Sequence, residues 1–149
     1  MTMPSDMAAF NAAVAEQFRA QKGTGELAGG RLTAAGPLHA DLLLLLTTVG
    51  AHSGEPRTTP LGWLRIDDRL VVVASNVGAA RHPGWYHNLV KNPQVTVELG
   101  DETFPATARP ATGAEYDRLW AGAVAQRPFF TDHQAKTERR IPVVVLERD

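Results

Sequence analysis

The chain has 149 residues, with 15 Lys and Arg against 16 Asp and Glu, and its formal net charge of −1 argues against a nucleic-acid-binding protein with a broad basic face. It contains no cysteine, which excludes disulfide frameworks, thiolate nucleophiles and Cys-type zinc sites and fits a cytoplasmic protein. The longest aliphatic run, residues 42–46, is far too short to cross a membrane, and the first residues lack the pattern of a signal peptide.

The N-terminal part of the chain predicts one helix followed by a loop. Over residues 5–20, Phe10, Val14 and Phe18 recur every four positions and give a helix one apolar face. Residues 23–36 are rich in glycine, which has no side chain to pack and interrupts regular structure. We therefore expect residues 1–40 to form a helix and a glycine-rich loop.

The middle of the chain predicts three strands in close succession. Residues 42–49 are an apolar run bounded by Gly50, and residues 58–66 and 70–75 read as two further strands. Asp67 and Asp68 predict a hairpin turn between the second and the third. Because the connections are short, we expect antiparallel neighbours rather than units with helical crossovers.

The second half predicts three helices and three strands. Pro83 suits the start of a helix that ends before Pro93. Thr112 stands three residues before Glu115, a capping-box pattern that predicts the start of another helix. The expected helices cover residues 83–91, 112–127 and 130–139, and the expected strands cover residues 94–99, 102–109 and 143–146.

Together these elements predict one domain, residues 1–149, of the α+β class. Six short strands with antiparallel links cannot form a doubly wound parallel sheet. They can close on themselves and so remove their exposed edges. We expect a small antiparallel six-stranded β-barrel with peripheral helices.

Several common catalytic motifs are missing from the sequence. It has no HExxH metal motif, no GxSxG nucleophile elbow, no GxGxxG and no phosphate loop of the GxxxxGK[ST] type. No pair of histidines has the spacing of a helical zinc site. We therefore expect no metal site, no serine hydrolase chemistry and no Rossmann-type nicotinamide binding.

Two segments combine groups that could bind an anion. In residues 47–61, a turn rich in small residues joins two apolar strands and carries Ser53 and Arg57. In residues 74–89, a strand ends in small and polar residues, and free N–H groups at the start of the following helix favour negative charge. From these residues alone, a hairpin turn and a capped helix explain both segments nearly as well.

The two segments and a third resemble a known family. The patterns TTxGxxSGxxRxTPL, ASNxGxxxHPxWYxNL and RxIPVVVLE, which start at Thr47, Ala74 and Arg139, are together specific for the deazaflavin-dependent nitroreductase and quinone reductase family. The similarity runs over about residues 42–147. It implies a split β-barrel that binds reduced coenzyme F420, a flat aromatic system with a long anionic tail.

The resemblance also implies a role for individual residues. It places the anionic tail at Ala51, His52, Ser53 and Arg57, with Pro60 on the strand beside them. It places the deazaflavin ring along Val73, Ala74, Ser75 and Asn76. The same groove would be flanked by Gly84, Trp85, Tyr86 and Asn88 and closed by Phe130.

The chain differs from the family at three places. Ala51-His52 stands where the family usually has Arg-Lys, and Val77-Gly78 stands where it usually has two glycines. Family members often carry tyrosines that can donate a proton after the helix at residues 112–127. Here Phe130 cannot donate, which leaves His133 as a candidate donor and Ser75 as a candidate for polarising the acceptor by hydrogen bonding.

The sequence thus predicts an F420H2-dependent oxidoreductase. It would transfer hydride from the reduced deazaflavin to an electron-poor small molecule, namely a quinone, a nitroaromatic or an activated enone. One alternative is an FMN- or haem-binding enzyme of the wider split-barrel superfamily, and another is a non-catalytic carrier of the coenzyme or a lipophilic anion. We expect a cytoplasmic monomer or homodimer with no metal and no nucleic-acid partner, and peripheral contact with a membrane remains open.

Overall fold

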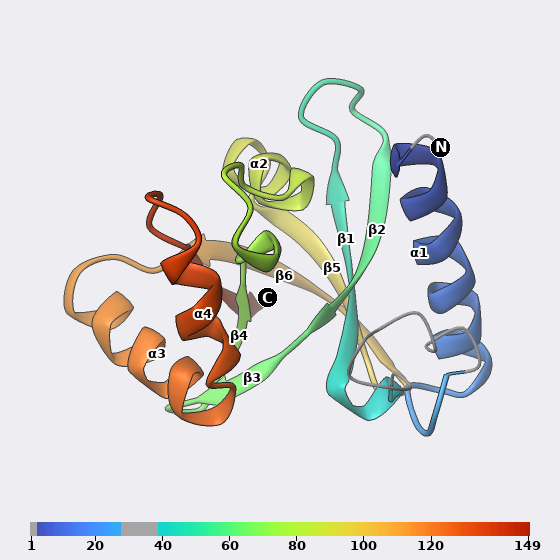
Figure 1. Ribbon diagram of the computed structural model, residues 1–149. Coiled ribbons are helices and arrows are strands. Elements are labelled where there is room, and N and C mark those ends of the chain that lie inside the picture. Colours follow the sequence, from blue (N-terminus) through green and yellow to red (C-terminus); the bar gives the residue numbers. More distant parts are fainter. Residues whose placement is uncertain (1–2, 28–38) are drawn as a thin grey trace.

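The computed structural model describes residues 3–27 and 39–149 (Figure 1). Most of the predicted glycine-rich loop, residues 28–36, lies outside the described residues. None of the helices in the described ranges combines the length and hydropathy that a membrane span needs.

In the described part of the chain, seven strands form one antiparallel sheet in the order β2-β1-β5-β6-β7-β4-β3. They are β1 (Leu43–Val49), β2 (Pro56–Gly62), β3 (Leu64–Ile66), β4 (Arg69–Val73), β5 (Gln94–Leu99), β6 (Glu102–Pro110) and β7 (Val143–Arg148). The antiparallel fold of the α+β class is confirmed. The strands number seven rather than six because the predicted strand at residues 58–66 is divided at Trp63.

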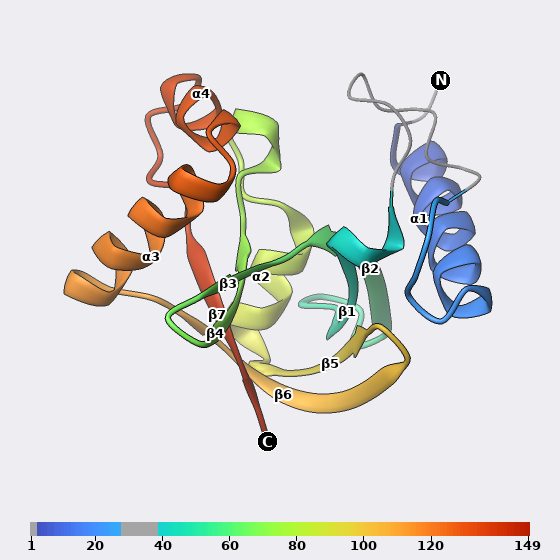
Figure 2. The same cartoon turned by 90° about the horizontal axis from the view of Figure 1, so that it is seen from below.

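This division explains the shape of the sheet. The segment that contains β2 and β3 is continuous along the chain, yet its two halves pair with β1 at one edge of the sheet and with β4 at the other. One segment can occupy both edges only if the sheet curls until the edges approach each other. Figure 2 shows the curled sheet from below, with β2 passing into β3. The curl brings the two edges of the sheet towards each other, and helix α1 (Met3–Ala20) packs against the edge strand β2.

Within residues 3–27 and 39–149, four helices surround the sheet. They are α1 (Met3–Ala20), α2 (Gly84–Lys91), α3 (Gly113–Gln126) and α4 (Phe129–Ala135), with short 3-10 turns η2 (Ala40–Leu42) and η3 (Asn76–Gly78). Helix α1 lies along β2, whereas α3 and α4 lie on the opposite side of the molecule (Figure 1). The last helix is shorter than the predicted residues 130–139 and ends at Ala135.

The strands alternate their side chains between two environments. Leu44 and Leu46 of β1 point into the curl of the sheet, where they join Trp85 of α2, and Leu45 points outward against Phe18 of α1. All three leucines are fully buried. Burial of each contributes about 1.5–3 kcal/mol, so the apolar run of β1 fixes both the sheet and its helices.

The predicted capping box at the start of α3 is wrong in its details. Thr112 is the N-cap residue, but its side chain makes no capping hydrogen bond. The Glu115 carboxylate instead accepts hydrogen bonds from the Arg109 guanidinium and forms an ion pair with Arg69 at 3.2 Å. Two guanidinium groups are stronger partners for a carboxylate than one backbone N–H, and the hydrogen bond from Arg109 lowers the pKa of Glu115.

Candidate functional site

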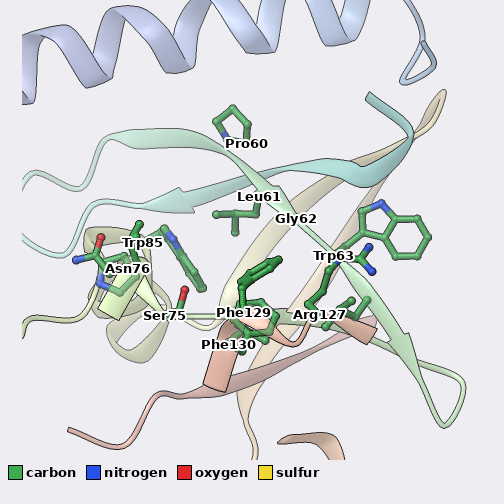
Figure 3. A pocket seen from close by; sticks show the side chains of 14 residues that line it. Pro60, Leu61, Gly62, Trp63, Ser75, Asn76, Trp85, Arg127, Phe129 and Phe130 are labelled. Carbon is green, nitrogen blue, oxygen red and sulfur yellow. The ribbon is translucent and has the colours of Figure 1, made fainter. Parts of the chain in front are cut away.

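A cavity of about 320 Å³ opens between the β2–β3 segment, the end of β4 and helices α2 and α4 (Figure 3). Its walls are mostly aromatic and aliphatic, with a few polar side chains. The lining residues are Pro60, Leu61, Gly62, Trp63, Leu64, Val73, Ser75, Asn76, Val77, Pro83, Trp85, Arg127, Phe129 and Phe130. Apolar walls with a few convergent polar groups are typical of a site for a small organic ligand.

The chain that leaves β4 has an unusual backbone where it borders the cavity. Asn76 and Val77 are both left-handed, with φ of 47° and 57°. A residue with a side chain pays roughly 1–2 kcal/mol for this conformation, and a β-branched residue is strained most. The Asn76 amide holds the segment by donating to the Arg81 carbonyl at 3.0 Å. The strained turn keeps Ser75 buried at the cavity wall, only 8% exposed.

Arg139 holds the segment that follows β4, residues 74–79, by hydrogen bonds to its backbone. Its guanidinium donates to three backbone carbonyls, those of Ala74 at 3.2 Å, Ser75 at 2.6 Å and Ala79 at 2.9 Å. It also lies 3.0 Å from Nδ1 of His82. Burial lowers the pKa of Arg139, and burial followed by the charge of Arg139 lowers the pKa of His82. Four acceptors on one planar cation tie the end of β4 to the chain that enters β7.

His133 of α4 lies next to Ser75. Its Nδ1 is 3.1 Å from the Ser75 hydroxyl oxygen. The imidazole centroid is 5.2 Å from the ring of Phe129 and 5.9 Å from that of Phe130, so two aromatic rings of the cavity wall surround it. Burial, and to a lesser degree the charge of Lys136, lowers the pKa of His133.

The turn between β1 and β2 forms a second, more exposed part of the candidate site. The Gly50 N–H donates to the Glu55 carbonyl at 2.8 Å, and the Glu55 N–H donates to the Ser53 hydroxyl at 3.1 Å. The Ser53 oxygen therefore already stabilises its own turn. His52 and Arg57 are exposed, and among the described residues Arg57 has no carboxylate within ion-pair distance.

Helix α2 connects this turn to the cavity. The Ala51 N–H donates to Oδ1 of Asn88 at 2.9 Å, and Nδ2 of Asn88 donates to the Thr48 hydroxyl at 3.0 Å. Lys91, one turn further along α2, donates to the Ala51 carbonyl at 2.6 Å. Thr48 is the cross-strand partner of Arg57, so the side chain of Arg57 belongs to the face of the sheet that carries α2.

The chain matches the F420H(2)-dependent quinone reductase family over residues 15–148. It belongs to this family. An F420H(2)-dependent quinone reductase of Mycobacterium tuberculosis is 42% identical over 130 residues, which cover 85% of this chain and 84% of the relative. The chain is therefore an oxidoreductase with coenzyme F420 as its cofactor, and the resemblance drawn from the three motifs is confirmed.

Solved structures agree with this assignment. An F420-H2 dependent reductase, FDR-A, is 40% identical with a TM-score of 0.65, over 71% of this chain and 94% of that one. A domain-swapped dimer is 32% identical with a TM-score of 0.67, over 97% and 99% of the two chains. The haem storage protein HutZ of Vibrio cholerae is 22% identical with a TM-score of 0.53 and shares the fold alone.

Most of the predicted site residues fall into two groups, those that line the cavity and those at the β1–β2 turn. Six of them line the cavity, namely Pro60, Val73, Ser75, Asn76, Trp85 and Phe130. The turn carries Ala51, His52 and Ser53, and Asn88 binds it, whereas Arg57, which was predicted to lie at the tip of this turn, is the second residue of β2. Four fit neither group, and one of them is His133, which lies beside Ser75 without lining the cavity. Ala74 is fully buried, Gly84 is exposed at the start of α2, and Tyr86 packs beside His82 with 4.7 Å between the ring centroids.

Sequence reasoning missed several residues of the site. Trp63, Arg127 and Phe129 line the cavity, Lys91 adds a cation at the turn, and Arg139 holds the cavity wall. For Lys91 a signal was available, because it follows Asn88 by three positions and so shares its helix face. The role of Arg139 depends on residues about sixty positions away, which no local pattern reveals.

Proposed function

We propose that the cavity holds the ring of reduced F420 and that the β1–β2 turn holds its anionic tail. The observation that carries the proposal is one continuous structure, helix α2. Trp85 of this helix lines the aromatic cavity, and Asn88 and Lys91 of the same helix bind the turn that precedes Arg57.

The residues present fit the coenzyme. Trp63, Trp85, Phe129 and Phe130 supply apolar walls for a flat aromatic ring. Ser75 and Asn76 supply polar groups at the edge of these walls. At the turn, Arg57 and Lys91 supply two cations for a polyanionic tail.

When bound, reduced F420 supplies a hydride for the reduction. The protein contributes orientation, since the aromatic wall, of which Trp85 is buried, gives the flat ring a surface to pack against. Among the three acceptor classes expected from the sequence, we propose a quinone, as the family name and the curated relatives support. Nitroaromatics and activated enones remain substrates to test.

The test of this function is a titration followed by a turnover assay. F420 fluorescence should be quenched on binding, and the loaded protein should reduce menadione. An equal titration with flavin mononucleotide should show at least tenfold weaker binding. Failure of F420 to bind, or a preparation that carries flavin, would overturn the proposal in favour of the FMN alternative. Binding without turnover of any acceptor would favour the carrier.

The tail site has its own test. Arg57→Ala should weaken F420 binding by about 1.5–3 kcal/mol, roughly ten- to a hundredfold, because hydrogen bonds to charged groups are of this strength. Arg118→Ala removes an exposed arginine from α3, where it lies 3.8 Å from Asp67, and serves as the matched control. Unchanged affinity in a folded Arg57→Ala variant would place the tail elsewhere.

We further propose a cytoplasmic homodimer. The absence of cysteine supports the compartment, and the domain-swapped dimer among the related structures supports the assembly. Light scattering at several protein concentrations tests the oligomer.

We also propose peripheral contact with a membrane. It is supported by the exposed apolar side chains of Val77 and Phe129, which line the cavity and are 68% and 48% exposed. Co-flotation with anionic vesicles tests it.

A further inference from the structure

Reduction of a quinone by a hydride requires a proton as well. The acceptor gains two electrons and one proton with the hydride, and its oxygen needs one more proton to become a hydroquinone. The cavity offers few groups that could deliver it. Apart from two indoles, the polar side chains of its wall are Ser75, Asn76 and Arg127. An amide and a guanidinium hold their protons too strongly to act as general acids near neutral pH.

Ser75 is the remaining group, and it is connected to a group that titrates. Its hydroxyl lies at the cavity wall and is 3.1 Å from Nδ1 of His133. A hydroxyl can accept a proton on one side while it donates on the other. When His133 donates to the Ser75 oxygen, the serine proton is free to point into the cavity.

Close packing fixes the distance between the two side chains. A Cβ atom added to Gly78 would lie 2.6 Å from the carbonyl oxygen of His133 and 3.1 Å from its Cα. Glycine at this position therefore lets the turn after Ser75 press directly against α4. Arg139 holds the Ser75 carbonyl at 2.6 Å from the other side. These two backbone contacts therefore fix the positions of the Ser75 and His133 side chains relative to each other.

We propose that His133 supplies a proton through Ser75 to the oxygen of the acceptor, and this inference rests on the proposed function. In this step the Ser75 O–H bond breaks as the acceptor O–H bond forms, and the serine oxygen takes a proton from Nδ1 of His133. His133 then regains a proton from water. Ser75 is the catalytic residue, since it touches the acceptor, and His133 acts through it as a positioning residue.

The charges around His133 set the direction of the pH dependence. Within the described residues, Lys136, the C-cap residue of α4, and Asp132 of α4 are the charges that act on the His133 imidazole. Arg139 binds the adjoining Ser75 carbonyl, and Arg127 lies at the cavity wall. Burial and Lys136 lower its pKa below the ordinary 6.5. The protonated form is the donor, so the rate of reduction should fall as the pH rises through this lowered value.

Two variants and one control separate the proton step from binding. Ser75→Ala removes the hydroxyl. His133→Asn keeps an N–H near the position of Nδ1 but cannot titrate in this range. His39→Asn removes an exposed histidine at the start of η2 and is the matched control. For each protein we would measure F420 binding by fluorescence and the single-turnover reduction of menadione between pH 5 and pH 8.

We expect F420 binding to stay within about threefold of wild type in His133→Asn and His39→Asn. Ser75→Ala removes a polar group of the proposed ring site, so its rate is measured at saturating F420, where it reports the reduction step alone. Ser75→Ala should slow reduction on the order of 10²-fold, the usual scale for lost general acid catalysis. His133→Asn should lose the pH dependence, whereas His39→Asn should keep it. A wild-type pH profile in His133→Asn, or a wild-type rate in Ser75→Ala, would overturn the proposal. Loss of F420 binding to the wild-type protein would instead overturn the proposed function.

An NMR titration of the coenzyme-free protein gives a readout independent of activity. The His133 imidazole resonances should titrate below pH 6.5, and Ser75→Ala should shift their midpoint, because it removes the partner of Nδ1. An unchanged midpoint in Ser75→Ala would show that the two side chains are not coupled, and the proposal would fail.

Discussion

The cavity wall and the β1–β2 turn are held in different ways. At the wall, Arg139 binds three backbone carbonyls and His82, and Ser75 contacts His133. At the turn, His52 and Arg57 are exposed. The turn itself is fixed by short local hydrogen bonds and by two side chains of α2.

This difference predicts how each part contributes to binding. Buried contacts are preorganised and little screened by salt, whereas exposed cations lose much of their attraction once the ionic strength reaches about 0.15 M. We therefore expect the wall to determine the orientation of the ring and the turn to add a salt-dependent share of the affinity. Substitutions in the two regions should therefore differ in their effects on stability and on salt-dependent binding.

The largest effect is expected at Arg139. Arg139→Ala should lower the free energy of unfolding by about 3 kcal/mol, because hydrogen bonds to a charged group contribute roughly 1.5–3 kcal/mol each and neighbouring losses are not additive. Urea denaturation measures it. Arg118 of α3, exposed and 3.8 Å from Asp67, is the control, and Arg118→Ala should cost about 1 kcal/mol or less. An equal loss in the free energy of unfolding in Arg139→Ala and in the control variant would show that Arg139 does not stabilise the cavity wall.

Gly78→Ala should be the next most costly change. Its φ is +81° and the added Cβ would meet the His133 carbonyl at 2.6 Å, so we expect a loss of about 2–3 kcal/mol and a displaced α4. Gly54→Ala at the turn is the control, because its φ is +72° but nothing lies within 4 Å of the added atom. It should carry only the backbone cost of about 1 kcal/mol. Similar losses at both positions would contradict the tight contact between η3 and α4.

Val77→Gly should stabilise the protein. A valine with φ of 57° is strained, and its 68% exposed side chain contributes little burial, so glycine should raise the free energy of unfolding by about 1 kcal/mol. Asp68→Gly is the control, with φ of 61° in the hairpin turn, where aspartate tolerates this conformation better. An unchanged free energy of unfolding in Val77→Gly, measured by thermal unfolding, would show that Val77 is not strained at the cavity wall.

The smallest effect is expected at the turn. His52→Lys adds a cation beside Arg57 and Lys91 and should tighten F420 binding about two- to threefold, in line with roughly 0.5 kcal/mol for an exposed ionic contact. The gain should vanish in 1 M salt. His39→Lys, distant from the turn in sequence, should change nothing. A gain that persists at high salt would mean that the turn is less exposed to solvent than the structure shows.

Much of the fold could be predicted because its signals are local. The apolar run of β1 and the four-residue spacing of α1 predicted their elements closely. Asp67 and Asp68 predicted a hairpin, and both adopt the left-handed φ that a tight hairpin turn requires. The motif around Ser53 and Arg57 likewise predicted a turn with exposed polar groups, since a turn is specified by the residues within it.

The strand pairing and the cavity wall could not be predicted in this way. No local pattern shows that residues 56–66 occupy both edges of the sheet, because the division at Trp63 follows from the curl of all seven strands. Arg139 binds Ser75 across 64 positions, and Ser75 contacts His133 across 58. Local residue patterns were thus sufficient for the helices, the strands, the turn and the family. The polar groups that meet at the cavity emerge from packing, which brings together residues whose local signals are independent of one another.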